Sequence, residues 1–252
     1  MTHSNKAKPH YIHPPIMEAV CEIHFADERR TEEQLLQIVP TWIEKYPNQQ
    51  IVEEQSMQVE IGMLGATVKQ AKLGKKLICK SLDGTRLVQL TGQMLAVNQL
   101  RPYMGWKEGF RDIILARWAE IQRELGVSAV RTIALRYINR IEIKQSPLRW
   151  DEWFNYPIPF PNVGGQPITN FQMGCCQALS ETVKFTVNVT NAQNPEPDFT
   201  WVILDITVIM EDSFPGDDLE QRLEMIHGPH SDAFELYIRD TLRSQFVNSA
   251  QS

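Results

Sequence analysis

Apolar and polar side chains alternate most clearly along residues 130–143, in the middle of the chain. Ile133 and Leu135 fall on one side of this segment, and Arg136 and Arg140 fall on the other. Alternation with a period of two is typical of a strand with one buried face. The pattern therefore predicts a long central strand.

A second alternating segment, residues 16–25, follows two prolines near the start of the chain. Small and apolar side chains fall on one side of it, while Glu18, Glu22 and His24 fall on the other. Side chains at every second position share a face of a strand. We expect a second half-buried strand whose outer face carries ionisable groups.

Helical periodicity is strongest over residues 106–125, followed by Gly126 in the position that commonly ends a helix. Apolar residues spaced three or four apart share one face, at Phe110, Ile114, Trp118, Ile121 and Leu125. Trp118 is expected to be a core residue. A last helical region is predicted after residue 215, interrupted by Gly228 and Pro229 and restarted at Ser231.

Further strands are predicted near residues 57–64, 76–82, 86–91, 94–98, 168–179, 182–190 and 199–211. The fold class is therefore α+β: two tandem pseudo-repeats of strand, helix, antiparallel β-meander and closing helix, with the helices packed on one face of the sheet or sheets. The predicted divisions are a flexible arm (1–13), two halves forming one compact unit (14–127 and 128–247) and a tail (248–252).

Composition places the chain among ordinary globular proteins, with 42% hydrophobic and 22% charged residues in 252. A net charge of −6 argues against a general binder of phosphate backbones. No signal-peptide core and no apolar run of about 18 residues is present, so we expect a cytoplasmic protein that does not enter a membrane. Cys175 and Cys176 would point to opposite faces of a strand, which disfavours a disulfide between them.

The polar strand faces are the main candidate binding site. Glu18, Glu22 and His24 could form an acid–base or metal cluster, or meet Arg136 and Arg140 in a cross-strand charge network. A third reading is a surface for a ligand or partner, because the guanidinium fork suits carboxylate or phosphate groups. The sequence leaves these readings open.

Other polar residues are interpreted as structural. Tyr137 and Asn139 fall on the apolar side of the central strand, and a buried Asn must be hydrogen-bonded. Asp205 interrupts a strand that is otherwise apolar on both faces. His227 and His230 are expected to flank a break in the helix, which removes the geometry of a zinc helix. No metal or cofactor is predicted.

The chain carries Pro-Pro-Ile-x-Glu-Ala-Val-x-Glu-Ile-x-Phe at 14–25, Leu-Arg-Tyr-Ile-Asn at 135–139 and Ile-Leu-Asp-Ile at 203–206. With these motifs it resembles, over nearly its whole length, a sporadically distributed prokaryotic family of uncharacterised proteins of about this length. The resemblance brings no reaction, cofactor or catalytic residue with it. A sporadic distribution implies an accessory, mobile or defence-related role.

These observations lead first to a non-enzymatic protein-interaction or sensor module, an accessory component of a prokaryotic system, with a protein partner. The loop 157–167 is the expected exposed feature. The alternative is a nucleic-acid or nucleotide-binding protein that uses Arg136, Arg140 and the basic run at Lys69, Lys72, Lys75 and Lys76. The third is a hydrolase acting through the Glu18, Glu22 and His24 face. No catalytic residue is assigned, because no phosphate-binding loop, nucleophile elbow or zinc motif is present.

Overall fold

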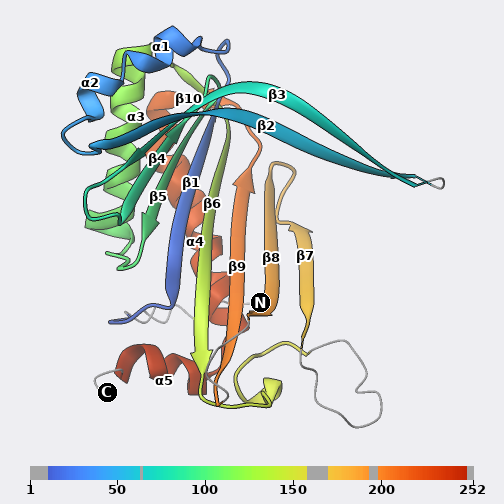
Figure 1. The fold of residues 1–252 in the computed structure, drawn as a ribbon. Helices are drawn as coiled ribbons and strands as arrows, with labels where there is room; N and C mark the ends of the chain where they lie inside the picture. Colours follow the sequence, from blue (N-terminus) through green and yellow to red (C-terminus); the bar gives the residue numbers. More distant parts are fainter. Residues whose placement is uncertain (1–10, 63–64, 158–169, 193–197, 249–252) are drawn as a thin grey trace.

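The two alternating segments pair with each other at the centre of a single sheet. In the computed structural model, which describes residues 11–62, 65–157, 170–192 and 198–248, they form β1 (Ile16–Phe25) and β6 (Ala129–Ile143). The two strands run antiparallel, with Val20 opposite Arg136. Both halves of the chain therefore contribute to one sheet, as Figure 1 shows.

The sheet has ten strands in the order β2-β3-β4-β5-β1-β6-β9-β8-β7, and β10 pairs with β6. The remaining strands are β2 (Asn48–Gly62), β3 (Gly65–Lys80), β4 (Arg86–Leu90), β5 (Met94–Leu100), β7 (Gln172–Ala178), β8 (Val183–Ala192), β9 (Thr200–Met210) and β10 (Phe214–Pro215). All of these pairs are antiparallel, as expected for a meander on each side of the central strands.

The helices are α1 (Glu32–Leu36), α2 (Val39–Trp42), α3 (Arg111–Leu125), α4 (Leu219–Tyr237) and α5 (Asp240–Asn248). The two longest, α3 and α4, cover one face of the sheet (Figure 1). Short helical turns are the π-helical η1 (Trp106–Phe110) and the 3-10 turns η2 (Trp150–Glu152) and η4 (Gly216–Asp218). A capping box at Thr31 starts α1, and Gly126 ends α3 in the left-handed conformation.

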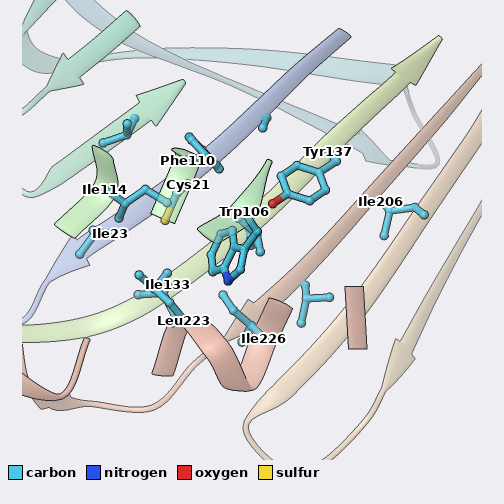
Figure 2. Packing of buried hydrophobic residues seen from close by; sticks show 14 of the residues in the cluster. Cys21, Ile23, Trp106, Phe110, Ile114, Ile133, Tyr137, Ile206, Leu223 and Ile226 are labelled. Carbon is cyan, nitrogen blue, oxygen red and sulfur yellow. The ribbon is translucent and has the colours of Figure 1, made fainter. Parts of the chain in front are cut away.

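The helix-covered face of the sheet holds the core. All five apolar positions predicted on α3 and its lead-in are buried. Trp118 is 3% exposed, and its indole nitrogen donates to the Gly216 carbonyl oxygen at 3.0 Å. Figure 2 shows side chains from η1, α3, α4 and the central strands gathered in this layer. Burying each large apolar side chain contributes about 1.5–3 kcal/mol to folding.

Two predicted elements differ from the structure. The prediction of a helix break at Gly228 and Pro229 is wrong, because α4 runs unbroken through both. Ile226, His230 and Ala233 are buried on either side of Pro229, and these contacts outweigh the cost of about 3 kcal/mol that proline adds within a helix.

The strand predicted near 57–64 is present, but its predicted bounds are wrong. The strands β2, over residues 48–62, and β3, over residues 65–80, form a long, curved two-stranded ribbon that extends beyond the rest of the sheet (Figure 1). Residues 1–10, most of the predicted loop 157–167 and residues 249–252 lie outside the described residues. In the described part of the chain, no helix is both long and apolar enough to cross a membrane.

Candidate functional site

A pocket of about 400 Å³ lies between the helix-covered face of the sheet and α4. Its floor is the start of β1 and the middle of β6, and its walls are the segment before η1, one face of α4 and the N-terminal residues 11–16. The residues lining it are Tyr11, Ile12, Pro14, Pro15, Ile16, Tyr103, Met104, Gly105, Trp106, Tyr137, Asn139, His227, His230, Ser231, Phe234 and Glu235. Pockets of this size, mainly apolar with a few polar groups, are typical of small-molecule sites.

Aromatic rings of the pocket are held in place by one another. The Trp106 ring stacks on His227 with centroids 4.1 Å apart and planes 3° apart, and its indole nitrogen donates to Glu224 at 2.9 Å. The Tyr137 ring meets His230 edge-on at 4.3 Å. Trp106 and Tyr137 come from η1 and β6, and both belong to the buried layer in Figure 2. The aromatic surface is therefore rigid before any ligand arrives.

Tyr103 and Tyr137 provide a hydrogen-bond donor. Their hydroxyl oxygens are 2.9 Å apart, and either hydroxyl can donate to the other. One of the two protons is then left for a different acceptor. Burial raises the pKa of Tyr103 and that of Tyr137, so both phenols keep their protons at neutral pH.

Asn139 provides an acceptor. This side chain is 2% exposed, and its amide nitrogen donates to the carbonyl oxygens of Leu204 at 3.0 Å and Tyr137 at 3.4 Å. Both amide protons are used in this way, so Oδ1 is the atom with which Asn139 can bind a ligand. The prediction that Asn139 is hydrogen-bonded is confirmed, and its bond to Leu204 fastens β6 to the neighbouring β9.

His230 is also fixed by the sheet. Its Nε2 lies 3.1 Å from the carbonyl oxygen of Ile206, and a carbonyl oxygen only accepts. The neutral ring therefore carries its proton on Nε2. This bond ties the middle of α4 to β9 and places the ring against Tyr137.

Glycine shapes the wall that carries Tyr103 and Trp106. Gly105 has φ = 91°, which L side chains rarely adopt. A Cβ on Gly109 would lie 2.9 Å from the carbonyl oxygen of Met104, so the turn can close against η1 only with glycine there. These two positions let Met104 and Trp106 turn toward the pocket.

The N-terminal wall is attached to the helices. The Tyr11 hydroxyl donates to Glu235 at 2.6 Å, and its ring meets Phe234 and Phe246 edge-on. The backbone nitrogen of His13 donates to the carbonyl oxygen of Phe246 at 3.3 Å. Tyr11 and His13 thus make defined contacts, although the sequence predicted a flexible arm through residue 13.

Charge in the pocket is close to balanced. Glu235 is the one carboxylate among the described lining residues, and no described lysine or arginine lines the pocket. Glu235 pairs with Arg243 at 2.8 Å outside the lining. The pocket therefore favours uncharged ligands over anions.

Glu18, Glu22 and His24, the residues singled out from the sequence, lie on the opposite face of the sheet. Glu18 accepts a hydrogen bond from the Asn98 side chain at 2.6 Å, and Glu22 lies 3.5 Å from His24. The hydrogen bond from His24 is the main cause that lowers the pKa of Glu22. In the described part of the chain, no group of three or more His, Cys, Asp or Glu side chains is arranged to hold a metal ion.

The two predicted arginines have different surroundings. Arg136 forms a two-pronged ion pair with Asp205, at 2.8 and 2.7 Å, rather than bonding Glu18 or Glu22 directly. The hydrogen bond from Arg136 to Asp205 is the main cause that raises the pKa of Arg136. The negative charges of Glu18 and Glu22 raise it further. Arg140 pairs with Glu142 at 2.8 Å and lies over the Trp201 ring.

Sequence reasoning missed the pocket because its residues come from four separate segments of the chain. Tyr137 and Asn139 were noted as polar residues on an apolar face, and that was the available signal. His227 and His230 were noted as well, but the predicted helix break separated them. Tyr103 and Trp106 carried no signal beyond their aromatic character.

Comparisons with known proteins add no functional information. No family model matches the chain, and no curated protein matches it. Among solved structures, it is similar to the S. pombe Pct1 RNA triphosphatase in complex with the Spt5 CTD, at 8% identity over 87% of this chain and 82% of that chain. The TM-score is 0.13, too low to support an argument about fold or function.

Proposed function

We propose that this protein is a non-enzymatic sensor module that binds a small, flat, uncharged organic molecule in the pocket between β6 and α4. The observation that carries the proposal is the set of fixed aromatic rings around one available donor and one available acceptor. Flat ligands gain the most binding free energy from such rings, because they can stack on them and contact their edges. The Tyr103–Tyr137 pair and Asn139 Oδ1 would orient a ligand that has both an acceptor and a donor, such as a carboxamide.

Binding fits the pocket better than proton transfer does. A general acid or base works best with a pKa near the operating pH. Burial moves the pKa of both tyrosines away from neutrality. Glu235, the one carboxylate, is occupied by Tyr11 and Arg243. A sensor also needs a partner that detects the bound state, and we place that partner among proteins, in keeping with the accessory role implied by the sequence resemblance.

Benzamide and its saturated analogue cyclohexanecarboxamide test the proposal. Both carry the same amide, but only benzamide is flat. Ligand-observed NMR should detect benzamide bound to the protein, with cyclohexanecarboxamide binding more weakly. Tyr137→Phe keeps the ring and removes a hydroxyl, so it should weaken benzamide binding about threefold to tenfold.

Tyr156→Phe is the matched control, because Tyr156 is a tyrosine in a different aromatic cluster, against Trp150 and Tyr237. It should leave benzamide binding unchanged. Equal binding of the flat and saturated amides, or equal effects of the two tyrosine substitutions, would rule out the proposed site.

We also infer that the two halves derive from tandem copies of one unit. The order of strands supports this inference: β5, β4 and β3 follow outward from β1, as β9, β8 and β7 follow outward from β6. In each half the opening strand pairs with the last strand of its own meander.

A further inference from the structure

A second pocket, of about 640 Å³, lies on the other side of the N-terminal segment. It forms where β1 begins and β6 continues past it, near the end of α5. Ile12, residues 14–16 and Tyr103 line both pockets, but this one also contains His13, Arg101 and Arg140. Its chemistry is therefore different from that of the aromatic pocket.

Arg101 is held by the backbone. Its Nε donates to the carbonyl oxygen of Ile16 at 3.2 Å, and its Nη2 donates to those of Pro15 at 3.2 Å and Arg140 at 3.4 Å. These bonds fix the guanidinium at the point where β1 and β6 separate. They use Nε and Nη2 and leave Nη1 for another acceptor.

Arg140 is held by side chains. Its Nη2 lies 2.8 Å from Glu142, and the guanidinium lies 4.7 Å from the centroid of the Trp201 ring. A cation over an indole face is stabilised and restricted in its motion. Two guanidinium groups are therefore positioned in one pocket before any ligand binds, which reduces the entropy lost on binding.

The local charge is unbalanced. Among the described lining residues, Arg101 and Arg140 are accompanied by one carboxylate, Glu142, and by His13, although the whole chain has a net charge of −6. Burial, and after it the charge of Arg140, lowers the pKa of Arg101. Like charges in one pocket repel each other, and a bound anion would relieve that repulsion.

We propose that Arg101 and Arg140 form a binding site for an oxyanion, the phosphate or carboxylate group of a small molecule. Guanidinium groups bind both oxyanions through short, charge-assisted hydrogen bonds. This site is independent of the aromatic pocket, which has no described cation in its lining. Either proposal can therefore fail without the other.

Calorimetric titration with inorganic phosphate, and separately with acetate, at constant ionic strength tests the site. The intact protein should bind at least one of the two anions saturably. Arg140→Gln removes one fork and should weaken that binding about tenfold or more. Arg140→Lys keeps the positive charge but loses the guanidinium fork. Its affinity for the anion should therefore fall between that of the intact protein and that of Arg140→Gln.

Arg136→Gln is the matched control. Arg136 lies on the same face of the same strand and is also paired with a carboxylate, but it is outside the pocket. The Arg136→Gln variant should bind the anion with the same affinity as the intact protein. Thermal unfolding of each variant checks that it is folded, and Arg140→Lys replaces Arg140→Gln if the latter is not.

Each outcome decides the proposal. Phosphate binding without acetate binding assigns a phosphate-bearing ligand, and the reverse assigns a carboxylate. No saturable binding of either anion overturns the site. Equal weakening by Arg136→Gln and by the Arg140 variant overturns it as well, because the effect would then reflect general charge.

Discussion

At the scale of single residues, burial decides which charged side chains stabilise this protein. Glu120 is 7% exposed and accepts hydrogen bonds from Trp42 at 2.6 Å, Arg117 at 2.8 Å and Lys45 at 2.8 Å. Arg117 is itself 6% exposed. The bond from Trp42 joins α2 to α3. A buried pair of this kind is tolerated while it is complete, but either member alone is costly.

Glu120→Ala should lower the free energy of unfolding by about 3–5 kcal/mol, because it leaves Arg117 buried without its carboxylate. Urea unfolding at pH 7 measures the change. The double variant Arg117→Met with Glu120→Leu should recover much of the loss, since neither charge remains. A double variant less stable than Glu120→Ala would show that the ion pair stabilises the fold in its own right.

At the scale of elements, Asp27 joins the end of β1 to the start of β6. Its carboxylate accepts the backbone N–H groups of Ser128 at 3.0 Å and Ala129 at 3.1 Å, and the Ser128 hydroxyl at 3.0 Å. Partial burial opposes ionisation, but these hydrogen bonds outweigh it and lower the pKa of Asp27. The side chain thus closes the two central strands at one end.

Asp27→Asn should destabilise the protein at pH 7 by about 1–2 kcal/mol, because an amide accepts these N–H groups less well. A carboxyl whose pKa is lowered by folding contributes stability above its unfolded pKa, near 3.9, and loses it as pH falls through the folded value. The free energies of unfolding of the intact protein and of Asp27→Asn should therefore converge as the pH falls below about 4. Asp151→Asn, at an exposed position, is the control and should show no such trend.

At the scale of the whole molecule, the central pairing of β1 and β6 makes the two halves depend on each other. The helices also cross the division: Trp106, in the first half, stacks on His227, in the second. Trp118 donates to Gly216 across the same division. Separating the halves would expose the edges of both central strands and these aromatic side chains.

The full chain should therefore unfold in one cooperative transition, with tryptophan fluorescence and far-UV circular dichroism giving the same midpoint in urea. Residues 14–127 and 128–247 produced separately should each lack a cooperative transition. Two transitions in the full chain, or a folded separate half, would show that the halves are independent domains.

Much of the fold follows from local patterns in the sequence. Alternation defined β1, β6 and β8 to within a few residues, and a run that is apolar on both faces defined β9. The spacing of Phe110 to Leu125 defined the buried face of α3 and its lead-in. These predictions succeed because periods of two and of about four mark which face of an element is apolar. The polar face carrying Glu18, Glu22 and His24 was also correctly placed away from the core.

Only the tertiary structure decided the rest, and the reason is physical. The continuity of α4 through Pro229 depends on contacts that Ile226 and His230 make with distant strands, which no local pattern contains. Arg136 could not be matched to Asp205 until β6 and β9 were known to be neighbours. Both pockets are formed by segments up to about two hundred residues apart in the chain. The sequence determined the elements and their buried faces, whereas pairing and packing determined which side chains meet.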